Sequence, residues 1–509
     1  MTTERAMRLA DLLADHADAG AAGGIVVRGL ALDSREVRAG DAFVALKGSR
    51  EHGITFAPTA LARGAAAILA ERPEVVVASA PAFLHSAEGR MGEIGADAPL
   101  IWIDRLREKV GPIAARFFAD PSHSLAIVGV TGTNGKTSTV HLLAQALSHA
   151  GHKVATIGTL GAGLFGAVAE GVRTTPDAIA VQGLLAAFRD EDATHVAMEV
   201  SSHALDQGRV NGVAFDIAVF TNLTRDHLDY HGTMGDYGAA KERLFSWPGL
   251  TAAVINADDA FGRALAARVP EDVALIRYGI DRDDADVVAR DIATSTSGLR
   301  FHLATPWGEG IVESRLLGRF NVSNLLAVAS CLGRLDFPFE AIRDAMSNLD
   351  PVAGRMNRLG GEGALPLIVV DYAHTPDALE QALTSLRAHC SGRLICVFGC
   401  GGERDAGKRP EMGAIAQALS DRIIVTDDNP RGEDGGDIVA QIVAGLSRPE
   451  LALIERDRGA AIAIAVSEAN AGDIVLIAGK GHEPYQEIAG VKHPFDDLLV
   501  ARAALEARR

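Results

Sequence analysis

Residues 125–138 read Leu-Ala-Ile-Val-Gly-Val-Thr-Gly-Thr-Asn-Gly-Lys-Thr-Ser and contain the clearest local pattern in the chain. Leu125–Val130 is a continuous apolar run, which is typical of a strand buried on both faces of a sheet. A loop of glycine, threonine and asparagine follows, and a helical pattern runs from Thr137 to about His149. This order predicts a phosphate-binding loop, because backbone N–H groups and the helix N-terminus converge on an anion.

The side chains of this loop suit ATP. Lys136 supplies a positive charge for the β- and γ-phosphates, and the Thr137 hydroxyl can bind Mg²⁺. Five residues separate Gly129 from Gly135, one more than in the common form of the loop, so this is a variant. The alternative interpretation is a glycine turn that caps a helix beside a solvated lysine. The expected ATP contacts are Gly132, Thr133, Asn134, Gly135, Lys136, Thr137 and Ser138.

The same alternation of apolar runs and helix-length stretches extends along the chain. Further runs are Val154–Ile157, Val196–Val200, Ile217–Phe220, Ala252–Asn256, Leu367–Val370, Leu394–Phe398, Ile423–Val425 and Ile474–Ala478. They predict an α/β fold, with a mainly parallel, doubly wound central sheet and a C-terminal Rossmann-like unit. Breaks near Asp120-Pro121 and Asp350-Pro351 divide the chain into a small α/β domain (1–120), a central domain (121–350) and a C-terminal domain (351–509).

Composition excludes several classes of protein. Of 509 residues, 49 are basic and 66 acidic, and the net charge of −17 disfavours nucleic acid as a partner. The four cysteines form no C-x-x-C pair and no zinc spacing, so a reducing compartment is expected. The N-terminus lacks the apolar core of a signal peptide, and no apolar stretch predicts a membrane span. We expect a monomer in the cytoplasm.

Polar groups follow two of the central strands. Glu199 ends one apolar run, and residues 222–231, which include His227, follow another. Ligand residues occupy such positions in open α/β sheets, and the set suits one or two Mg²⁺ ions. Taken singly, each residue is better explained by a structural hydrogen bond. Lys241, by composition, is interpreted as a solvated helix lysine.

Three segments of the C-terminal domain suit an amino acid. Arg404 stands where a dinucleotide-binding loop would have its last glycine, and it suits a carboxylate. In Asp428-Asn429-Pro430-Arg431, the guanidinium can bind a carboxylate and Asp428 an amine, although a plain Asn-Pro turn is the alternative. Glu483, in Gly479–Glu483, stands where a second ammonium group could bind.

Together these motifs resemble the Mur ligases, the ATP-dependent amide ligases of peptidoglycan synthesis. The segments that carry the resemblance are Thr131–Thr137, Glu199–His203, Asn222–His231, Gly318–Asn324, Gly354–Met356 and Asp371–Asp377. They occur in order along the whole chain. Folylpolyglutamate synthases share the loop and the central domain but lack the Asp33-Ser34-Arg35 segment and the Asp428–Arg431 motif.

Within this family the chain resembles the members that add meso-2,6-diaminopimelate to the D-glutamate of UDP-N-acetylmuramoyl-L-alanyl-D-glutamate. Those members carry the four residues found here at 428–431, and the lysine-adding members lack the arginine. Diaminopimelate has a distal carboxylate that lysine lacks, so bound lysine would leave Arg431 desolvated and unpaired. Addition of lysine or another amino acid remains the alternative within the family.

The resemblance also implies roles for single residues. Leu32, Ser34, Ser49, Arg50, Glu51, Thr174, Thr175, Ser201, Gln207 and Arg209 match contacts of the UDP-linked dipeptide. Arg404, Asp428, Asn429, Pro430, Arg431, Gly479 and Glu483 match the diaminopimelate pocket, and Asn321 and Arg355 match ATP contacts. Thr137, Glu199 and His227 match the Mg²⁺ site, and the implied catalytic residues are Lys136, His227 and Lys241, the last as an N6-carboxylysine. Arg173 departs from relatives with asparagine there.

The implied reaction transfers the γ-phosphoryl group of ATP to the D-glutamate carboxylate. The amine of diaminopimelate then attacks the acyl phosphate and an amide forms. Because the three substrates are expected on three domains, closure of the C-terminal domain before reaction is predicted. Two alternatives from other classes are a P-loop ATP-binding regulator without an amino-acid pocket and a dinucleotide-dependent oxidoreductase.

Overall fold

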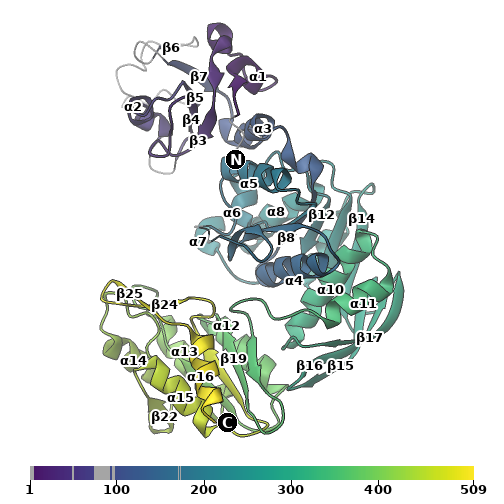
Figure 1. Cartoon of the computed structure of the whole chain (residues 1–509), viewed down its shortest axis with the longest axis vertical. Coiled ribbons are helices and arrows are strands. Elements are labelled where there is room, and N and C mark those ends of the chain that lie inside the picture. The colour runs from purple at the N-terminus through teal and green to yellow at the C-terminus, as the bar shows by residue number, and fades with distance from the viewer. Residues whose placement is uncertain are drawn as a thin grey trace. The chain divides into compact units, whose positions relative to one another are not determined.

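The computed structural model of the chain is drawn in Figure 1. It describes residues 5–48, 51–73, 92–93, 98–169, 171 and 173–508, so Ser49 and Arg50 lie outside the described residues. The chain forms two compact units. The first contains Met1–Ile255 and Asp259–Ile276, and the second contains Asn256–Asp258 and Arg277–Arg509. The division into domains 1–120, 121–350 and 351–509 stays a prediction.

The first unit begins with a small sheet in the order β3-β4-β5-β7-β6. Strands β3 (Gly29–Ala31), β4 (Asp41–Ala45), β5 (Ala67–Glu71) and β7 (Pro99–Ile103) are parallel, and β6 (Gly92–Glu93) is antiparallel to β7. Around it lie β1 (Met7–Arg8), α1 (Leu9–Leu13), β2 (Val26–Val27), α2 (Ala57–Ala62) and α3 (Leu106–Phe117). Two apolar clusters enclose this sheet, because alternate side chains of β4 and β5 point to opposite faces.

The main sheet of the first unit has the strand order β10-β9-β11-β8-β12-β13. Strands β9 (Val154–Gly158), β11 (His195–Glu199), β8 (Ala126–Thr131), β12 (Ile217–Phe220) and β13 (Ala252–Asn256) are parallel, and β10 (Gly161–Leu164) is antiparallel. Their connections contain α4 (Lys136–His149), α5 (Ala178–Asp190), α6 (Ser202–Asp206), α7 (Leu228–His231), α8 (Met234–Glu242) and α9 (Ala260–Ala266). This confirms the predicted doubly wound sheet, whose strands are apolar because both faces are covered.

The second unit begins with an antiparallel meander that the sequence did not predict. Strands β15 (Val287–Ser295), β16 (Gly298–Thr305) and β17 (Gly308–Ser314) pair in order, and helices α10 (Arg319–Arg334) and α11 (Phe339–Ser347) follow. Strand β14 (Ala274–Ile280) runs from the first unit into the second, where its last residues pair with β15 in parallel.

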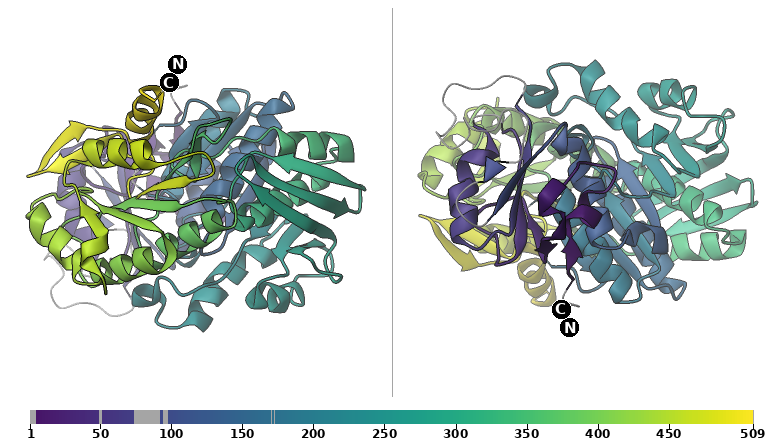
Figure 2. Two further views of the ribbon diagram at one scale, coloured as in Figure 1. Left: turned by 90° about the horizontal axis from the view of Figure 1, so that it is seen from below. Right: turned by 90° about the horizontal axis from the view of Figure 1, so that it is seen from above.

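The rest of the second unit is a six-stranded sheet in the order β18-β19-β23-β20-β21-β22. Strands β19 (Leu367–Asp371), β23 (Ile474–Ala478), β20 (Leu394–Phe398), β21 (Arg422–Val425) and β22 (Ala452–Ile454) are parallel, and β18 (Asn357–Gly360) is antiparallel. Helices α12 (Pro376–Arg387), α13 (Lys408–Leu419) and α14 (Gly435–Val443) cover one face of this sheet, and α15 (Arg458–Glu468) and α16 (Asp497–Glu506) cover the other. Figure 2 shows helices on both faces of the sheet. A hairpin of β24 (Tyr485–Ile488) and β25 (Val491–Pro494) follows β23.

The predicted Rossmann-like unit is therefore confirmed. Within the part of the chain that the structure describes, none of the helices has the length and apolar character of a membrane span.

Candidate functional site

The loop between β8 and α4 has the backbone of a phosphate-binding loop. Gly132 and Gly135 have φ angles of +150° and +84°, which favour glycine. A Cβ atom on Gly132 would also collide with the Thr221 hydroxyl. The loop therefore needs a glycine at position 132 for two separate reasons.

The end of β12 holds this loop in place. The Thr133 N–H donates to the carbonyl of Asn222 at 2.9 Å, and the Asn134 N–H donates to its side-chain Oδ1 at 2.9 Å. The Thr221 hydroxyl donates to the carbonyl of Asn134 at 2.6 Å. The loop conformation thus depends on the neighbouring strand as well as on its own glycines.

Two lysines meet at this loop. Lys136 Nζ donates to the carbonyls of Gly132 and Thr133, each at 2.8 Å. Lys241 Nζ donates to the same Gly132 carbonyl at 2.8 Å and lies 4.3 Å from the centre of the Tyr237 ring. Lys241 is only 1% exposed, so its interpretation as a solvated lysine is wrong. Burial, with a smaller contribution from Lys136, lowers its pKa well below the usual value.

Glu199 lies at the carboxyl end of β11, opposite Val130 of the adjacent β8. Its carboxylate is 1% exposed and accepts hydrogen bonds from the Thr159 N–H at 2.7 Å and the Thr159 hydroxyl at 3.2 Å. A Cβ atom on Gly158 would collide with this carboxylate. The acid is therefore fixed beside the strand that leads into the phosphate loop.

His227 is half exposed and has a φ angle of +53°. Its Nε2 lies 3.4 Å from Asp226 Oδ2, and its ring centre lies 4.9 Å from that of His203. In the described ranges, no group of three or more His, Cys, Asp or Glu side chains is arranged to hold a metal ion. The Thr137 hydroxyl and the Glu199 carboxylate are oxygen donors that fit Mg²⁺, whereas the His227 imidazole is not a preferred ligand type.

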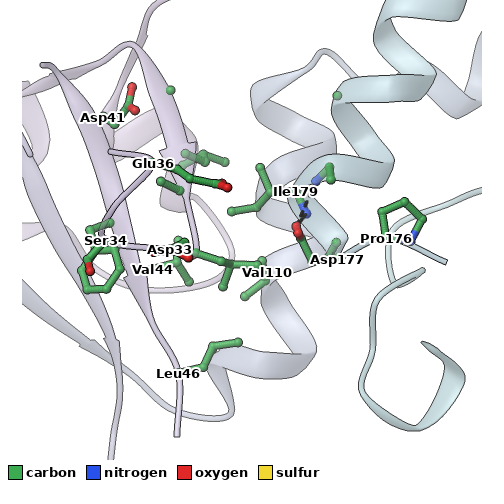
Figure 3. A pocket seen from close by; sticks show the side chains of 18 of the residues that line it. Asp33, Ser34, Glu36, Asp41, Val44, Leu46, Val110, Pro176, Asp177 and Ile179 are labelled. Carbon is green, nitrogen blue, oxygen red and sulfur yellow. Dashed lines mark hydrogen bonds between the residues drawn. The ribbon is translucent and has the colours of Figure 1, made fainter. Parts of the chain in front are cut away.

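A large open cleft of about 2210 Å³ lies in the first unit. Five of the residues expected to contact the UDP-linked dipeptide line it, namely Leu32, Ser34, Glu51, Gln207 and Arg209. Figure 3 shows Asp33, Ser34 and Glu36 of the N-terminal sheet region on one side, and Asp177 and Ile179 at the start of α5 on the other. Arg173, where the family pattern is not kept, also lines this cleft.

The remaining expected dipeptide contacts connect this cleft to Glu199. Arg209 donates to the carbonyl of Thr175 at 3.0 Å and to Gln207 Oε1 at 2.7 Å. The Thr175 hydroxyl donates to the carbonyl of Glu199 at 2.8 Å and lies 3.4 Å from that of Ser201. The Thr174 hydroxyl lies 3.1 Å from that of Thr159, which also contacts Glu199. The structure therefore brings these residues into one continuous network.

A second polar site lies in the second unit, where the loops after β20, β21 and β23 meet. A Cβ atom on Gly479 would collide with the Asp428 carboxylate, and one on Gly399 would lie 2.9 Å from the Asp428 nitrogen. A Cβ atom on Gly401 would lie 2.8 Å from Arg431 Nη1 and 3.8 Å from Arg404 Cγ. The two arginines expected to bind carboxylates are thus neighbours at this glycine.

Arg431 has a φ angle of +54°, and the backbone of β24 supports it. Its N–H donates to the carbonyl of Glu487 at 2.9 Å, and its Nη1 donates to the carbonyl of Gly402 at 2.7 Å. Its Nε lies 3.7 Å from the Glu487 carboxylate, and its side chain is 18% exposed. The guanidinium is therefore oriented by the protein and largely withdrawn from solvent, whereas Arg404 is exposed.

Two acids and a buried lysine complete this site. Glu483 Oε2 accepts hydrogen bonds from Asn429 Nδ2 at 2.8 Å and Lys480 Nζ at 3.3 Å. Burial raises the pKa of Asp428, while Arg458 and Lys480 act in the opposite direction. Lys480 was missed by the sequence reasoning, although it lies within the segment 479–483 and could have been found there.

Asn321 and Arg355, the two expected ATP contacts in the second unit, lie in different surroundings. Asn321 is 6% exposed, donates to the carbonyl of Leu317 at 2.8 Å and accepts from Asn324 Nδ2 at 2.9 Å. Its amide therefore supports the start of α10. The Arg355 guanidinium lies 5.3 Å from the centre of the Tyr372 ring. Their role in ATP binding stays a prediction.

Comparison with known proteins defines the class. Three family models match in order: the catalytic domain of the Mur ligase family over residues 26–118, the Mur ligase middle domain over 130–332, and the glutamate ligase domain of Mur ligases over 354–481. Together with the full-length relatives given next, these matches show that the chain belongs to the Mur ligase family.

Similar curated proteins carry one specific name. The UDP-N-acetylmuramoyl-L-alanyl-D-glutamate–2,6-diaminopimelate ligase of Xanthomonas campestris pv. campestris is 56% identical over 507 residues, which cover 99% of this chain and 98% of that one. The enzyme of the same name from Pseudomonas aeruginosa is 50% identical over 484 residues, covering 95% and 96%. These relatives match the chain from end to end.

Solved structures agree with this grouping. A structure of a UDP-N-acetylmuramoyl-L-alanyl-D-glutamate–2,6-diaminopimelate ligase matches with a TM-score of 0.75 and 38% identity, covering 99% of each chain. A MurF ligase from Thermotoga maritima in complex with ADP matches with a TM-score of 0.58 and 20% identity, covering 95% of this chain and 99% of that one. The second match supports the fold alone.

Proposed function

We propose that the chain is an ATP-dependent ligase that joins meso-2,6-diaminopimelate to the D-glutamate of UDP-N-acetylmuramoyl-L-alanyl-D-glutamate during synthesis of the peptidoglycan precursor. The full-length identity to ligases of that name supports it. One observation of geometry carries the choice of amino acid: Arg431 is oriented and largely buried beside Arg404, while Asp428 and Glu483 lie in the adjoining loops. This set matches a carboxylate and an ammonium group on one ligand.

The phosphate loop supplies the ATP end of the reaction. The N-terminus of α4, which begins at Lys136, suits the phosphates, and Lys136 can exchange its carbonyl contacts for phosphate oxygens. The γ-phosphoryl group passes to the D-glutamate carboxylate and forms an acyl phosphate. Mg²⁺, for which the Thr137 hydroxyl and Glu199 carboxylate are suitable ligands, supplies neutralisation of phosphate charge when bound.

The cleft of the first unit suits the UDP-linked substrate. Its lining contains Lys47, Arg107 and Arg209, whose charges suit a diphosphate, and apolar side chains of α3 and α5. The network from Arg209 through Thr175 links the cleft to Glu199 at the end of β11. Glu199 lies beside the strand β8 that leads into the phosphate loop, where the acceptor carboxylate must arrive. The amine of diaminopimelate then attacks the acyl carbon, phosphate leaves, and the amide remains.

Lys241 is proposed to carry the carbamate implied by the family resemblance. The reaction joins a neutral amine to CO₂ and releases a proton, so the lowered pKa of Lys241 favours it. We expect activity to fall in buffer freed of CO₂ and to return with bicarbonate, and the Lys241→Met variant to be inactive in both. Activity indifferent to bicarbonate would contradict the modification.

The test of the proposed function is product formation. The protein is incubated with ATP, the UDP-linked dipeptide and, in separate reactions, meso-diaminopimelate, LL-diaminopimelate, L-lysine or L-ornithine. The products are identified by mass spectrometry. We expect ATP-dependent product with meso-diaminopimelate. Product with lysine alone would favour the alternative within the family, and product with none would refute the proposal.

We further propose that the protein works as a monomer in the cytoplasm. Its four free thiols fit a reducing compartment.

A further inference from the structure

Lys480 is a fully buried lysine in the loop that follows β23, with 0% of its side chain exposed. A buried ammonium group is costly unless it is paired and hydrogen-bonded. Its Nζ donates to Asn429 Oδ1 at 3.0 Å and to Glu483 Oε2 at 3.3 Å, and it lies 5.5 Å from the centre of the Tyr485 ring. Its partners therefore belong to the site proposed for the diamino acid.

The side-chain amide of Asn429 links the same groups. Asn429 is 1% exposed, and its Nδ2 donates to Glu483 Oε2 at 2.8 Å. Its Oδ1 accepts from Lys480 and from the Glu487 N–H, the latter at 2.9 Å. Two donors thus converge on one oxygen of Glu483, and no hydrogen bond within the described residues uses its other oxygen, Oε1.

We infer that Lys480 is a positioning residue for the incoming diamino acid: it holds Glu483 through Oε2 so that Oε1 stays available for the distal ammonium group. The inference rests on the proposed function. Asn429 shares this role, since its amide already binds three protein groups and acts on the ligand through Glu483.

Charge balance gives Lys480 a second effect on the same ligand. Asp428 and Glu483 carry two negative charges when ionised, and Lys480 interacts with both. Arg458, which also acts on Asp428, is paired with Asp497 at 2.7 Å. Lys480 between the two carboxylates therefore leaves a single net negative charge, which matches one ammonium group of the ligand. Without Lys480 the two acids would repel each other, and an uncompensated buried charge would remain.

This role differs from that of Arg431 in a measurable way. Lysine is diaminopimelate without the distal carboxylate, so both amino acids carry the distal ammonium group. Loss of Lys480 should therefore weaken binding of both by a similar factor, whereas loss of Arg431 should weaken diaminopimelate selectively.

The experiment compares Lys480→Met with Lys492→Met in the full-length protein. Lys492 is a matched control, because it is exposed and its Nζ lies 4.0 Å from the centre of the same Tyr485 ring. We expect Lys480→Met to raise the KM for meso-diaminopimelate roughly 10- to 100-fold, as for loss of a charge-assisted hydrogen bond. The KM for ATP should change less than about twofold, and Lys492→Met should match the wild type.

A double-mutant cycle separates positioning from a merely structural role. If Lys480 acts through Glu483, Lys480→Met should change the KM for diaminopimelate less than about threefold in a Glu483→Gln background. An undiminished effect there would overturn the inference, as would an equal rise in the KM for ATP or a wild-type KM for diaminopimelate in Lys480→Met. If Lys480→Met does not fold, Lys480→Gln, which keeps a hydrogen-bond donor, replaces it in the cycle. A wild-type protein that makes no product would refute the proposed function instead.

Discussion

Replacing Arg431 by alanine tests whether its guanidinium gives the protein its proposed selectivity for diaminopimelate. The guanidinium is 18% exposed and is oriented by the carbonyl of Gly402 and the carboxylate of Glu487. We expect the variant to lose most of its affinity for meso-diaminopimelate and to keep its affinity for ATP. The phosphate loop belongs to the first compact unit and Arg431 to the second, so the substitution leaves the ATP contacts of that loop unchanged.

The size of the effect follows from the site. A hydrogen bond to a charged group contributes about 1.5–3 kcal/mol, and a paired guanidinium–carboxylate contact lies near the upper value when water is largely excluded. Because Nη1 already donates to the carbonyl of Gly402, we use about 3 kcal/mol rather than the sum of two full bonds. This corresponds to a fall of roughly 100- to 200-fold in kcat/KM for meso-diaminopimelate.

The assay measures kcat and KM for meso-diaminopimelate, L-lysine and ATP in parallel. Arg422→Ala is the control, because Arg422 begins the strand β21 that leads to Arg431 and pairs with Glu468 at 3.1 Å. That variant should stay within about threefold of the wild type. In Arg431→Ala the ratio of kcat/KM for diaminopimelate to kcat/KM for lysine should fall by nearly the same factor as kcat/KM for diaminopimelate itself. An unchanged preference would refute Arg431 as the selector, whatever happened to the rate.

Two further predictions concern the first unit. Gly132→Ala places a Cβ against the Thr221 hydroxyl at a φ of +150° and should weaken ATP binding in calorimetry at least about tenfold, whereas Gly151→Ala, with a φ of +87° and open space, should not. Burial lowers the pKa of His141 to about 4. As pH falls from 6.5 towards 4, His141 therefore becomes protonated in the unfolded chain but stays neutral in the folded chain, and the folded state loses stability. This costs up to about 3 kcal/mol of stability. In urea melts His141→Leu should lessen that loss and exposed His149→Leu should not; equal pH slopes for all three proteins would contradict this.

The parallel strands could be predicted from the sequence because the information is local. Ile217–Phe220, Ala252–Asn256, Leu394–Phe398 and Ile474–Ala478 are strands with the predicted bounds. Each is covered on both faces, so every residue in these runs except Asn256 is apolar.

The antiparallel meander was not predicted, because its strands lack the continuous apolar runs that identify the parallel strands. From Arg290 on, β15 alternates between half-buried and exposed side chains, so it contains no long apolar run. A search for period-two alternation would have found β16, where Leu299, Phe301 and Leu303 alternate with Arg300 and His302.

In the candidate sites too, residues in local motifs could be predicted from the sequence, and residues whose burial depends on distant contacts could not. Motifs named most of the residues discussed in the two candidate sites, because glycine loops and charged groups at strand ends are visible in a few consecutive residues. The burial of Lys241 depends on a carbonyl 109 residues earlier in the chain, and that of Lys480 on an amide 51 residues earlier. Neither distance is encoded in local composition, which assigns a lysine to the surface by default.

In both sites local composition failed to predict the burial of a lysine, and this has a physical reason. A group that meets the ligand must stay accessible, so it lies in a loop with a recognisable pattern. A side chain that orients such a ligand-binding group must be withdrawn from water, because a hydrogen bond to a charge holds a side chain firmly only where solvent does not compete. Lys480 at 0% exposure and Glu483 at 21% illustrate the two positions within one motif of five residues. Buried charges next to a predicted ligand group are therefore where selectivity should be sought, and substitutions there should alter KM before they alter the fold.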